Sequence, residues 1–340
     1  MDHSFRNPLP GVPDVESPFF HQLFSDRTGE VKRIANDLHE NGFAVFEFPQ
    51  PDIGRVSTAI IDSLSPMVDL EGFRASRTDN LRVQDAWKAV PEVRRLACNR
   101  AVIDLLTTLY GRPAFPFQTL DFAAGSQQHP HTDSVHFSSI PERYMCGVWL
   151  ALEDISDDAG PLIYYPGSHK LPIYVNEHIG QLLSKDIYSA DQTWYEHAWR
   201  ELVRVHGLKE ARFTPRRGQA LIWAANLLHG GARHENRSRT RWSQVTHYYF
   251  EGCSYYTPMW SDPGFGRTYY RRPINLLTGA YQPHTYLSAP VPWQVTGPWG
   301  ECPMPGTLRQ VLHLTVPRVI RRLQSAVRRA RSLLGKPARA

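Results

Sequence analysis

The chain has 340 residues, of which 41% are hydrophobic and 21% are charged, a composition in the normal range for a globular protein and unlike that of a disordered one. The longest apolar stretches are too short to span a bilayer, and the N-terminus lacks the features of a signal peptide, which predicts a cytoplasmic protein. The four cysteines are scattered without a Cys-x-x-Cys pair, which indicates free thiols rather than a disulfide framework or a zinc site.

Positive charge is concentrated at the C-terminal end. The net charge is +5, and nine Lys or Arg residues, with no acidic residue among them, lie between Arg309 and Arg339. Without those nine cations the rest of the chain has a net charge of about −4. A nucleic-acid partner is therefore disfavoured, because nucleic-acid-binding domains usually carry a basic face.

The first third of the chain predicts an arm followed by helices around one strand. Residues 1–30 include many prolines and aromatic residues and are expected to pack on the body as an N-terminal arm. Apolar residues then recur at helical spacing, and Asn41-Gly42 supplies a stop signal for the first helix. The expected elements are a helix over 31–38, a strand over Phe43–Phe48, and helices over Ile53–Leu64, Glu92–Cys98 and Val102–Leu109.

From Phe115 onward, short β-rich runs alternate with turn signals. This pattern predicts a sandwich or jelly roll rather than a parallel α/β sheet. The expected strands are Phe115–Phe122, His131–Phe137, Met145–Leu152, Leu162–Tyr165, Ala220–Trp223 and Trp242–Phe250. We expect one domain over residues 31–305, with a partly helical insertion at 170–212 that covers one end of the barrel and with aromatic loops at 253–305.

A candidate metal site lies in the segment SQQHPHTDSVHF. His131 and Asp133 are two residues apart, and such residues point to the same face of a strand. His229, at the end of the apolar run LIWAANLLHGG, would supply a second imidazole from another strand. Two histidines and one carboxylate with open coordination positions are typical of non-haem Fe(II) oxygenases. Taken alone, a His-x-Asp triplet is better explained as a solvated surface pair, so the neighbouring motifs decide its interpretation.

Arg241 and Ser243 are candidates for an anion site. They share a face at the start of the alternating strand RWSQVTHYYF, and an arginine fork beside a hydroxyl suits a terminal carboxylate. Arg239, two residues upstream on the same face, is the nearest competitor, whereas Arg237 is expected to be a solvated loop residue. A metal triad with such a clamp fits an Fe(II) enzyme that uses 2-oxoglutarate, whose far carboxylate needs a cation.

Four segments of the sequence resemble the phytanoyl-CoA dioxygenase family of Fe(II)/2-oxoglutarate oxygenases. They are QHPHTDSVHF, CGVWLALEDISDDAGPLIYYPGSHK, GQALIWAANLLHGG and NRSRTRWSQVTHYYF, and the resemblance covers about residues 30–252. It implies a double-stranded β-helix, which is a jelly roll with helices packed outside. It also implies that His131, Asp133 and His229 are the iron ligands. By the same resemblance, Arg241 binds the carboxylate of 2-oxoglutarate.

The resemblance implies further roles. Ser243 fits the Arg-x-Ser pattern of 2-oxoglutarate oxygenases, and Gln128 and Trp149 lie where family members place cofactor-pocket residues. Related halogenases lack the carboxylate at the position of Asp133, so its presence favours hydroxylation or another oxidation. The implied reaction uses Fe(II), 2-oxoglutarate and O2 and releases succinate and CO2.

Several residues near these motifs have structural as well as functional interpretations. His129 and His136 flank the triad and are expected at the rim or behind the ligands, and a structural or rim role is expected for His169. His247 shares the face of Arg241 by parity, which fits either a pocket residue or a hydrogen-bonded core histidine. Core packing and a pocket position are equally compatible with Trp149. Contact with a substrate stays open for Arg82 and Trp87.

The strongest alternative function is a jelly-roll binding module that has lost turnover, since fold alone does not give function. The intact triad and the Arg-x-Ser pair argue against it, and a metal hydrolase would have no use for the Arg241 clamp. The sequence leaves the substrate open among small molecules, lipids and glycans.

The C-terminal segment, residues 306–340, predicts a basic amphipathic helix. Apolar residues recur at three- and four-residue steps over 316–334, and arginines fill much of the remaining surface. Such a helix is typical of peripheral contact with an anionic membrane, which would place the protein at the inner face of a membrane. Packing on the negatively charged body, or a solvated tail, would explain the pattern at least as well.

Overall fold

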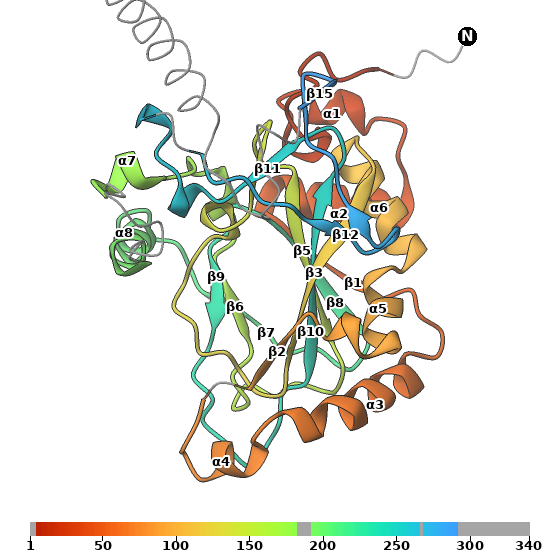
Figure 1. Cartoon of the computed structure of the whole chain (residues 1–340), viewed down its shortest axis with the longest axis vertical. Coiled ribbons are helices and arrows are strands. Elements are labelled where there is room, and N and C mark those ends of the chain that lie inside the picture. The colour runs from red at the N-terminus through yellow and green to blue at the C-terminus, as the bar shows by residue number, and fades with distance from the viewer. Residues whose placement is uncertain (1–4, 80, 182–191, 266–267, 292–340) are drawn as a thin grey trace, which may run out of the picture.

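The polypeptide folds around two antiparallel β-sheets with helices packed outside them (Figure 1). This computed structural model of the chain describes residues 5–79, 81–181, 192–265 and 268–291. The helices are α1 (Phe20–Leu23), α2 (Gly29–Asn41), α3 (Ile53–Leu64), α4 (Leu70–Arg74), α5 (Pro91–Ala97), α6 (Arg100–Tyr110), α7 (Asn176–Ile179) and α8 (Gln192–Val205). The longer strands, and the short ones that pair with them, are β1 (Phe43–Glu47), β2 (Arg82–Gln84), β3 (Ala114–Phe122), β4 (Ser138–Ile140), β5 (Met145–Ala151), β6 (Leu162–Tyr164), β7 (Ala211–Phe213), β8 (Gln219–Ala224), β9 (His229–Gly231), β10 (Ser243–Phe250) and β11 (Ser254–Tyr256).

The larger sheet has six strands in the order β1-β8-β5-β10-β3-β2, and a smaller sheet has three in the order β7-β6-β9. All neighbouring strands in both sheets pair antiparallel. Trp149, Leu221 and Trp223 of the larger sheet pack with Leu162 and Tyr164 of the smaller sheet in one apolar cluster. Two antiparallel sheets that pack face to face form the predicted jelly roll.

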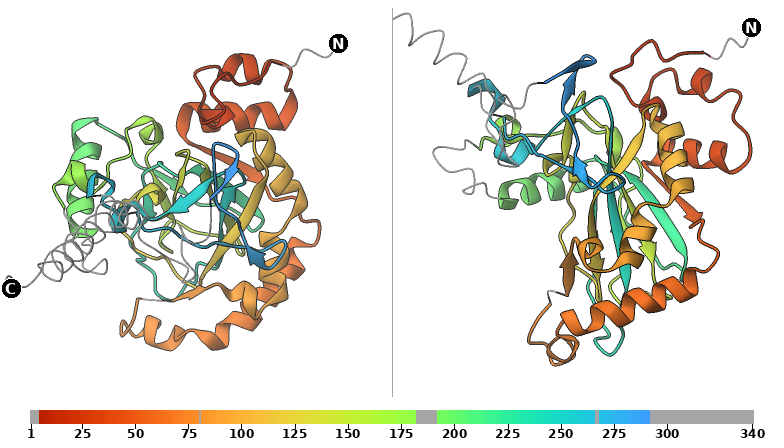
Figure 2. Two further views of the ribbon diagram at one scale, coloured as in Figure 1. Left: turned by 45° about the horizontal axis from the view of Figure 1, so that its top comes forward. Right: turned by 45° about the vertical axis from the view of Figure 1, so that its right-hand side comes forward.

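Helices α3, α5 and α6 cover the other face of the larger sheet (Figures 1 and 2). Their buried residues recur at helical spacing and pack against strand side chains in a second and larger apolar cluster. Members of that cluster include Ile60, Leu64, Val93, Leu106, Tyr248 and Phe250. The larger sheet therefore has a helix-covered face and a face that is turned toward the smaller sheet.

Most of the predicted helices are confirmed, and their ends follow from local signals. α2 ends at Asn41, where Gly42 adopts a φ of +81° and donates its N–H to the carbonyl oxygen of Leu38. Glycine is favoured at this left-handed position because it has no Cβ atom to clash. α3 has the predicted bounds, and α5 and α6 differ from the prediction by one or two residues at an end. The N-terminal arm packs on the body through Phe20 and Phe24, which are both buried.

The predicted strand His131–Phe137 is wrong. Asp133–Val135 form a short 3-10 turn instead, because the N–H groups of His136 and Phe137 both donate to the carbonyl oxygen of Asp133, at 2.9 and 2.8 Å. Only residues 138–140 of this region pair as a strand, β4. The argument that residues 131 and 133 share a face of a strand therefore fails, and a turn brings their side chains together.

The predicted strand Ala220–Trp223 is confirmed within β8, but the apolar run that ends at His229 does not continue as one strand. β8 ends at Ala224 in the larger sheet, and β9 begins at His229 in the smaller sheet. A tight turn separates them, in which the N–H of Leu227 donates to the carbonyl oxygen of Ala224 at 2.9 Å. His229 thus begins a strand on the opposite side of the barrel from Ala224.

Two predicted boundaries also need correction. The insertion at 170–212 contains α7 and α8 as expected, but it ends earlier, because residues 211–213 pair with β6 as strand β7. The region 253–305, predicted as loops, contains strand β11 and two short hairpins. These hairpins pair β12 (Ile274–Asn275) with β13 (Ala280–Tyr281) and β14 (Thr285–Tyr286) with β15 (Ala289–Pro290).

The predicted C-terminal helix, including residues 316–334, lies outside the described residues and stays a prediction. Cys98, Cys146 and Cys253 are free thiols, as expected, and Cys302 lies outside the described part of the chain. Within the described residues, we find no helix that is long and apolar enough to cross a membrane.

Candidate metal centre and active-site cavity

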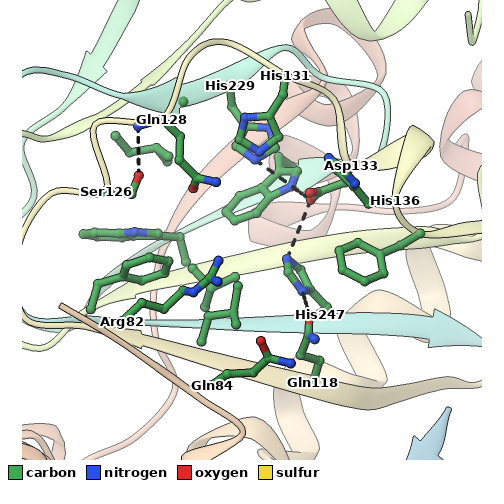
Figure 3. A pocket seen from close by; sticks show the side chains of 18 of the residues that line it. Arg82, Gln84, Gln118, Ser126, Gln128, His131, Asp133, His136, His229 and His247 are labelled. Carbon is green, nitrogen blue, oxygen red and sulfur yellow. Dashed lines mark hydrogen bonds and ion pairs between the residues drawn. The ribbon is translucent and has the colours of Figure 1, made fainter. Parts of the chain in front are cut away.

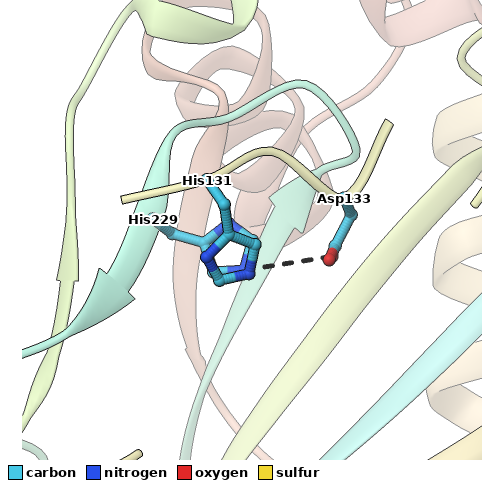
Figure 4. A group of neighbouring side chains, drawn as sticks. All are labelled: His131, Asp133 and His229. Atoms are coloured by element: carbon cyan, nitrogen blue, oxygen red, sulfur yellow. Dashed lines mark ion pairs between the residues drawn. The ribbon is translucent and has the colours of Figure 1, made fainter. Parts of the chain in front are cut away.

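Two histidines from distant parts of the chain are held side by side by their backbones. The N–H of His131 donates to the carbonyl oxygen of His229 at 2.9 Å, and the N–H of His229 donates to the carbonyl oxygen of His131 at 3.0 Å. This isolated antiparallel bridge joins the loop after β3 to the first residue of β9. It brings the two imidazole rings to a centroid distance of 4.6 Å (Figure 4).

In both imidazoles Nδ1 carries the proton, and Nε2 has a free lone pair. Nδ1 of His131 lies 2.9 Å from the carbonyl oxygen of His129, and Nδ1 of His229 lies 3.0 Å from that of Leu227. Because a carbonyl oxygen can only accept, each Nδ1 carries the proton and each Nε2 is free to bind a metal. Burial, with the neighbouring His229, lowers the pKa of His131 to about 3, so this ring is neutral at physiological pH.

Asp133 completes a buried cluster of three potential ligands. One ligand atom from each of His131, Asp133 and His229 lies within 4.8 Å of the others. Oδ2 of Asp133 accepts a hydrogen bond from Nε1 of Trp223 at 2.7 Å and lies 3.9 Å from Nε2 of His229. Burial acts to raise the pKa of Asp133, but the neighbouring histidines and the indole N–H outweigh it, so the pKa is lowered. The carboxylate of Asp133 is therefore ionised although it is buried.

A glycine sets the position of the indole that holds Asp133. The pairing of β5 with β8 places Gly147 opposite Trp223. A Cβ atom on Gly147 would lie only 2.3 Å from the indole ring, so no side chain fits between them. The ring lies over bare backbone and reaches Asp133 with its N–H group.

His247 extends the polar cluster away from the two ligand histidines. Its Nδ1 lies 2.9 Å from Oε1 of Gln118, its cross-strand neighbour on β3, and its Nε2 lies 3.7 Å from Oδ2 of Asp133. Figure 3 shows His247 between Asp133 and Gln118. The parity argument for a pocket position of His247 is thus confirmed, and its side chain is also hydrogen-bonded.

A cavity of about 460 Å³ opens beside this cluster, between the two sheets (Figure 3). Of its 23 described lining residues, nine lie on strands of the larger sheet, and Leu162, His229 and Gly230 come from the smaller sheet. Apolar wall residues include Leu120, Phe122 and Val245. More than half of the described lining residues are polar or charged, and a concave space with convergent polar groups beside apolar walls can bind a small molecule.

Arg241 places a buried positive charge in the same cavity. It is 2% exposed, its Nε donates to the carbonyl oxygen of Gly160 at 3.0 Å, and its Nη1 donates to Oγ of Ser243 at 2.9 Å. Its Cζ lies 5.4 Å from the ring centroid of Trp149 and 5.7 Å from that of Phe122. Burial lowers the pKa of Arg241 to about 10, which still leaves the side chain charged at neutral pH. Among the described residues, no carboxylate forms an ion pair with this guanidinium.

The comparison with protein families decides the assignment. The sequence pattern of the phytanoyl-CoA dioxygenase family matches residues 23–241, which is well over half of the chain. The chain belongs to the phytanoyl-CoA dioxygenase family. Members of this family are oxygenases that use non-haem iron and 2-oxoglutarate. Among curated proteins, none matches the sequence significantly.

Several solved structures are similar to this chain at low sequence identity and at TM-scores below 0.5. The epimerase SnoN, crystallised with Fe3+, alpha ketoglutarate and nogalamycin RO, is 18% identical at a TM-score of 0.49, over 69% of this chain and 91% of that chain. The carbocyclase SnoK from nogalamycin biosynthesis is 15% identical at a TM-score of 0.48, over 68% and 87%. EctD from S. alaskensis, with 2-oxoglutarate and 5-hydroxyectoine, is 17% identical at a TM-score of 0.47, over 77% and 81%.

In this phytanoyl-CoA dioxygenase family member, the residues predicted as a site come together around one cavity. The triad residues, Arg241, Gln128 and Trp149 all line it, and Ser243 is hydrogen-bonded to Arg241. Gln128 is exposed, whereas Trp149 is buried and packs edge-on against Phe213 as well as facing the cavity. Both interpretations of Trp149, core packing and pocket, therefore hold.

The competing residues fall elsewhere. Arg239 has a 56% exposed side chain whose Nε lies 3.5 Å from Oδ2 of Asp158, and it is not among the described lining residues. Arg237, expected in a solvated loop, instead donates to the carbonyl oxygen of Phe73 at 2.8 Å. His136 and Arg82 line the cavity, whereas, within the described part of the chain, His129, His169 and Trp87 are not part of its wall.

Sequence reasoning missed two residues that shape the site, Trp223 and Gln118. A tryptophan in the run LIWAANLLHGG has the pattern of core packing, and only the pairing of β8 with Gly147 reveals its N–H as a partner of Asp133. Gln118 lies in the apolar run around Phe115–Phe122, where a lone amide among large apolar residues was the available signal. A buried amide needs a hydrogen-bond partner, and His247 is that partner.

The residues present fit the two groups that the family uses. Two imidazole nitrogens with free lone pairs and one ionised carboxylate form the donor set of a facial iron site. Each ligand side chain has an outer hydrogen-bond partner, which is the usual way that metal ligands are oriented. A buried arginine without a carboxylate partner among the described residues suits one end of a dicarboxylate.

Proposed function

We propose that the protein is an iron- and 2-oxoglutarate-dependent hydroxylase in which His131, Asp133 and His229 hold Fe(II). Arg241, oriented by Ser243, binds the far carboxylate of 2-oxoglutarate, and Gln128 and Trp149 complete the cofactor pocket. The observation that carries this proposal is that one cavity contains a buried set of three potential ligands and a buried arginine. The presence of Asp133 supports hydroxylation, because related halogenases lack that carboxylate.

Bound iron would supply the activation of O2 and the oxidising power, so the task of the protein is to bind, orient and exclude water. The backbone carbonyls that accept from both Nδ1–H groups keep Nε2 of His131 and His229 ready as ligands. The N–H of Trp223 fixes the carboxylate of Asp133 and favours its ionised form. The ligand set is thus prepared before any metal arrives.

Arg241 has a different task in this proposal. Its guanidinium is held by Gly160 and Ser243 on one side and lies near the rings of Trp149 and Phe122, where little water can compete. A charge-assisted hydrogen bond is stronger in such a dry site than in water.

The cavity of about 460 Å³ supports a small-molecule, lipid or glycan-type substrate, with release of succinate and CO2. We also propose a cytoplasmic location.

The decisive experiment is the anaerobic addition of Fe(II) and 2-oxoglutarate to the purified protein. We expect a weak visible charge-transfer band that requires both components, because the keto acid chelates the iron. If no band forms and calorimetry detects no binding of 2-oxoglutarate, the proposed function is wrong.

A matched pair of variants tests the clamp. Arg241→Gln should weaken 2-oxoglutarate binding by about ten- to a hundredfold while iron binding changes little, because a buried charge-assisted hydrogen bond is lost. Arg239→Gln removes a surface cation two residues away and should leave both affinities unchanged. Calorimetric titration measures both constants, and equal effects of the two substitutions would contradict the assignment.

A further inference from the structure

The charged residues of the cavity do not balance once the proposed iron and 2-oxoglutarate are counted, and the inference below rests on that proposed function. The charged lining residues in the described chain are Asp133, Arg241, Arg82 and Arg271. Fe(II) with Asp133, and the two carboxylates of 2-oxoglutarate with Arg241, sum to zero. Arg82 and Arg271 remain, and both are positive. Because Arg82 is left over in this count, the cavity favours a negatively charged occupant.

Arg82 is the clearer of these two cations. It lies on β2, the edge strand of the larger sheet, where it pairs with Phe122 of β3. Its guanidinium forms no hydrogen bond or ion pair with another described residue, and it is exposed. Gln84, two residues along the strand and on the same face, also lines the cavity. In Figure 3 these two side chains lie on the side of the cavity away from His131 and His229.

Arg271 adds positive charge from another part of the chain. Its Nη1 donates to the hydroxyl of Thr257 at 3.0 Å, and its Cζ lies 4.9 Å from the ring centroid of Phe137. Arg271 also lines the main cavity, together with Phe137 and Thr257. The cation is therefore close enough to the cavity interior to act on a bound ligand.

An adjoining cavity of about 200 Å³ is lined by further cations. It shares Gln84, Gln118 and Arg271 with the main cavity and adds Lys88 and Arg272. Its described acidic lining residue is Asp85, whose carboxylate lies 3.2 Å from Nζ of Lys88. Three of the four charged residues that line this cavity in the described chain are therefore cations.

We propose that the substrate carries an anionic group, a carboxylate or a phosphate, which Arg82 binds with support from Arg271. The guanidinium of an arginine is suited to either group, because its N–H donors match pairs of oxygen atoms. Gln84 beside Arg82 can add a neutral donor. The reacting part of the substrate would then extend from this anchor toward the ligand cluster, and Arg82 would select acids over their neutral analogues.

The test uses the full chain, loaded anaerobically with Fe(II) and saturated with 2-oxoglutarate, so that Arg241 is occupied. The probes are two pairs of small molecules of similar shape, benzoate with benzamide and phenyl phosphate with phenol. Calorimetry measures their binding, and the charge-transfer band reports on the iron site. We expect the anion of at least one pair to bind about tenfold more tightly than its neutral partner. The pair that shows the preference identifies a carboxylate or a phosphate.

Substitutions test whether Arg82 causes this preference for the anionic probe. Arg82→Gln should reduce it to within about threefold, and Arg82→Lys should retain part of it, since a point charge replaces the fork. Arg55→Gln, which removes a 67% exposed cation on α3, should leave it unchanged. Thermal melting checks that each variant is folded, which we expect because Arg82 is exposed and has no hydrogen-bond or ion-pair partner in the part of the chain that the structure describes.

The possible failures are distinguishable. If the charge-transfer band never forms, the proposed function fails, and the charge count fails with it. If the band forms but neither anion binds more tightly than its neutral partner, or Arg82→Gln keeps the full preference, only the present inference is overturned. Loss of the band on addition of an anion would place that anion at the iron or at Arg241, and this result would also overturn it.

Discussion

The two faces of the larger sheet each bury a carboxyl group, and the pKa values of these two groups move in opposite directions. Asp133, on the cavity side, is 4% exposed and has a lowered pKa. Asp121, on β3, is 0% exposed, and burial, with a smaller effect from Asp85, raises its pKa well above 3.8. The depth of burial therefore does not explain why the pKa values of Asp133 and Asp121 differ.

The neighbours of each carboxyl group explain the difference. Asp133 has three imidazoles and an indole N–H around it. Asp121 points to the helix-covered face, and neither of its carboxyl oxygens has a hydrogen-bond partner among the described residues. Its cross-strand neighbour Gln244 donates to the carbonyl oxygen of Val93 on α5, and its Oε1 is also unpaired within the described structure. The groups that surround each carboxyl group, rather than its depth of burial, explain why the two pKa values move in opposite directions.

The largest expected effect comes from removing the ionised carboxylate. Asp133→Ala should lower iron affinity by at least about a hundredfold and abolish hydroxylation, since even the outer partners of metal ligands contribute ten- to a hundredfold. Iron binding is measured by anaerobic titration, and succinate release measures turnover. Asp121→Ala, the matched change on the other face, should leave iron affinity unchanged. Wild-type turnover in Asp133→Ala would show that the two aspartates do not differ in the way proposed.

A milder change tests the role of the donor. Trp223→Phe keeps an aromatic ring over Gly147 but removes the N–H that bonds to Asp133. We expect iron affinity to fall by about tenfold, because the carboxylate loses its fixed orientation. Trp242→Phe, at another buried tryptophan, controls for the loss of an indole from the core. If the two variants bind iron equally well, the hydrogen bond to Asp133 has no part in preparing the ligand.

The smallest effect concerns stability. Because the pKa of Asp121 is raised on folding, the carboxyl group stabilises the protein fully below its unfolded value of 3.8 and loses that contribution as pH rises. An asparagine does not ionise, so Asp121→Asn should prevent this loss of stability at high pH. The free energy of unfolding should increase by at least about 1 kcal/mol at pH 8, with a smaller gain near pH 4. Urea unfolding of both proteins at the two pH values measures the difference. A gain that does not grow with pH would mean that Asp121 is not protonated in the folded protein.

The sequence predicted the elements whose signals are local. The bounds of α3 and the end of α2 at Gly42 follow from periodicity and a glycine stop, and the alternation in 243–250 predicted β10. The candidate ligands His131, Asp133 and His229 were proposed because the His-x-Asp triplet occurs together with neighbouring motifs that resemble one family, and this resemblance did not depend on the strand that was predicted wrongly. The Arg-x-Ser pair was found in the same way.

What the sequence could not supply depends on contacts between distant segments. The bridge between His131 and His229 joins residues that are far apart in the chain, and no periodicity predicts it. The turn at Asp133 was read as a strand, because its stabilising hydrogen bonds are made by backbone groups that composition does not reveal. The role of Trp223 depends on the register of β8 with β5, which a single sequence does not fix.

The lack of space above Gly147 links a position with no part in the cavity wall to the chemistry at the iron. A methyl group there would collide with the indole of Trp223, and the indole could escape only by withdrawing its N–H from Asp133. Among related sequences, the residues at positions 147 and 223 should therefore covary. Where position 147 has a larger residue than glycine, position 223 should have a smaller side chain, and another residue should donate the hydrogen bond to the aspartate. The pair Gly147 and Trp223, which resembles ordinary packing between two strands, would then be under selection for metal binding.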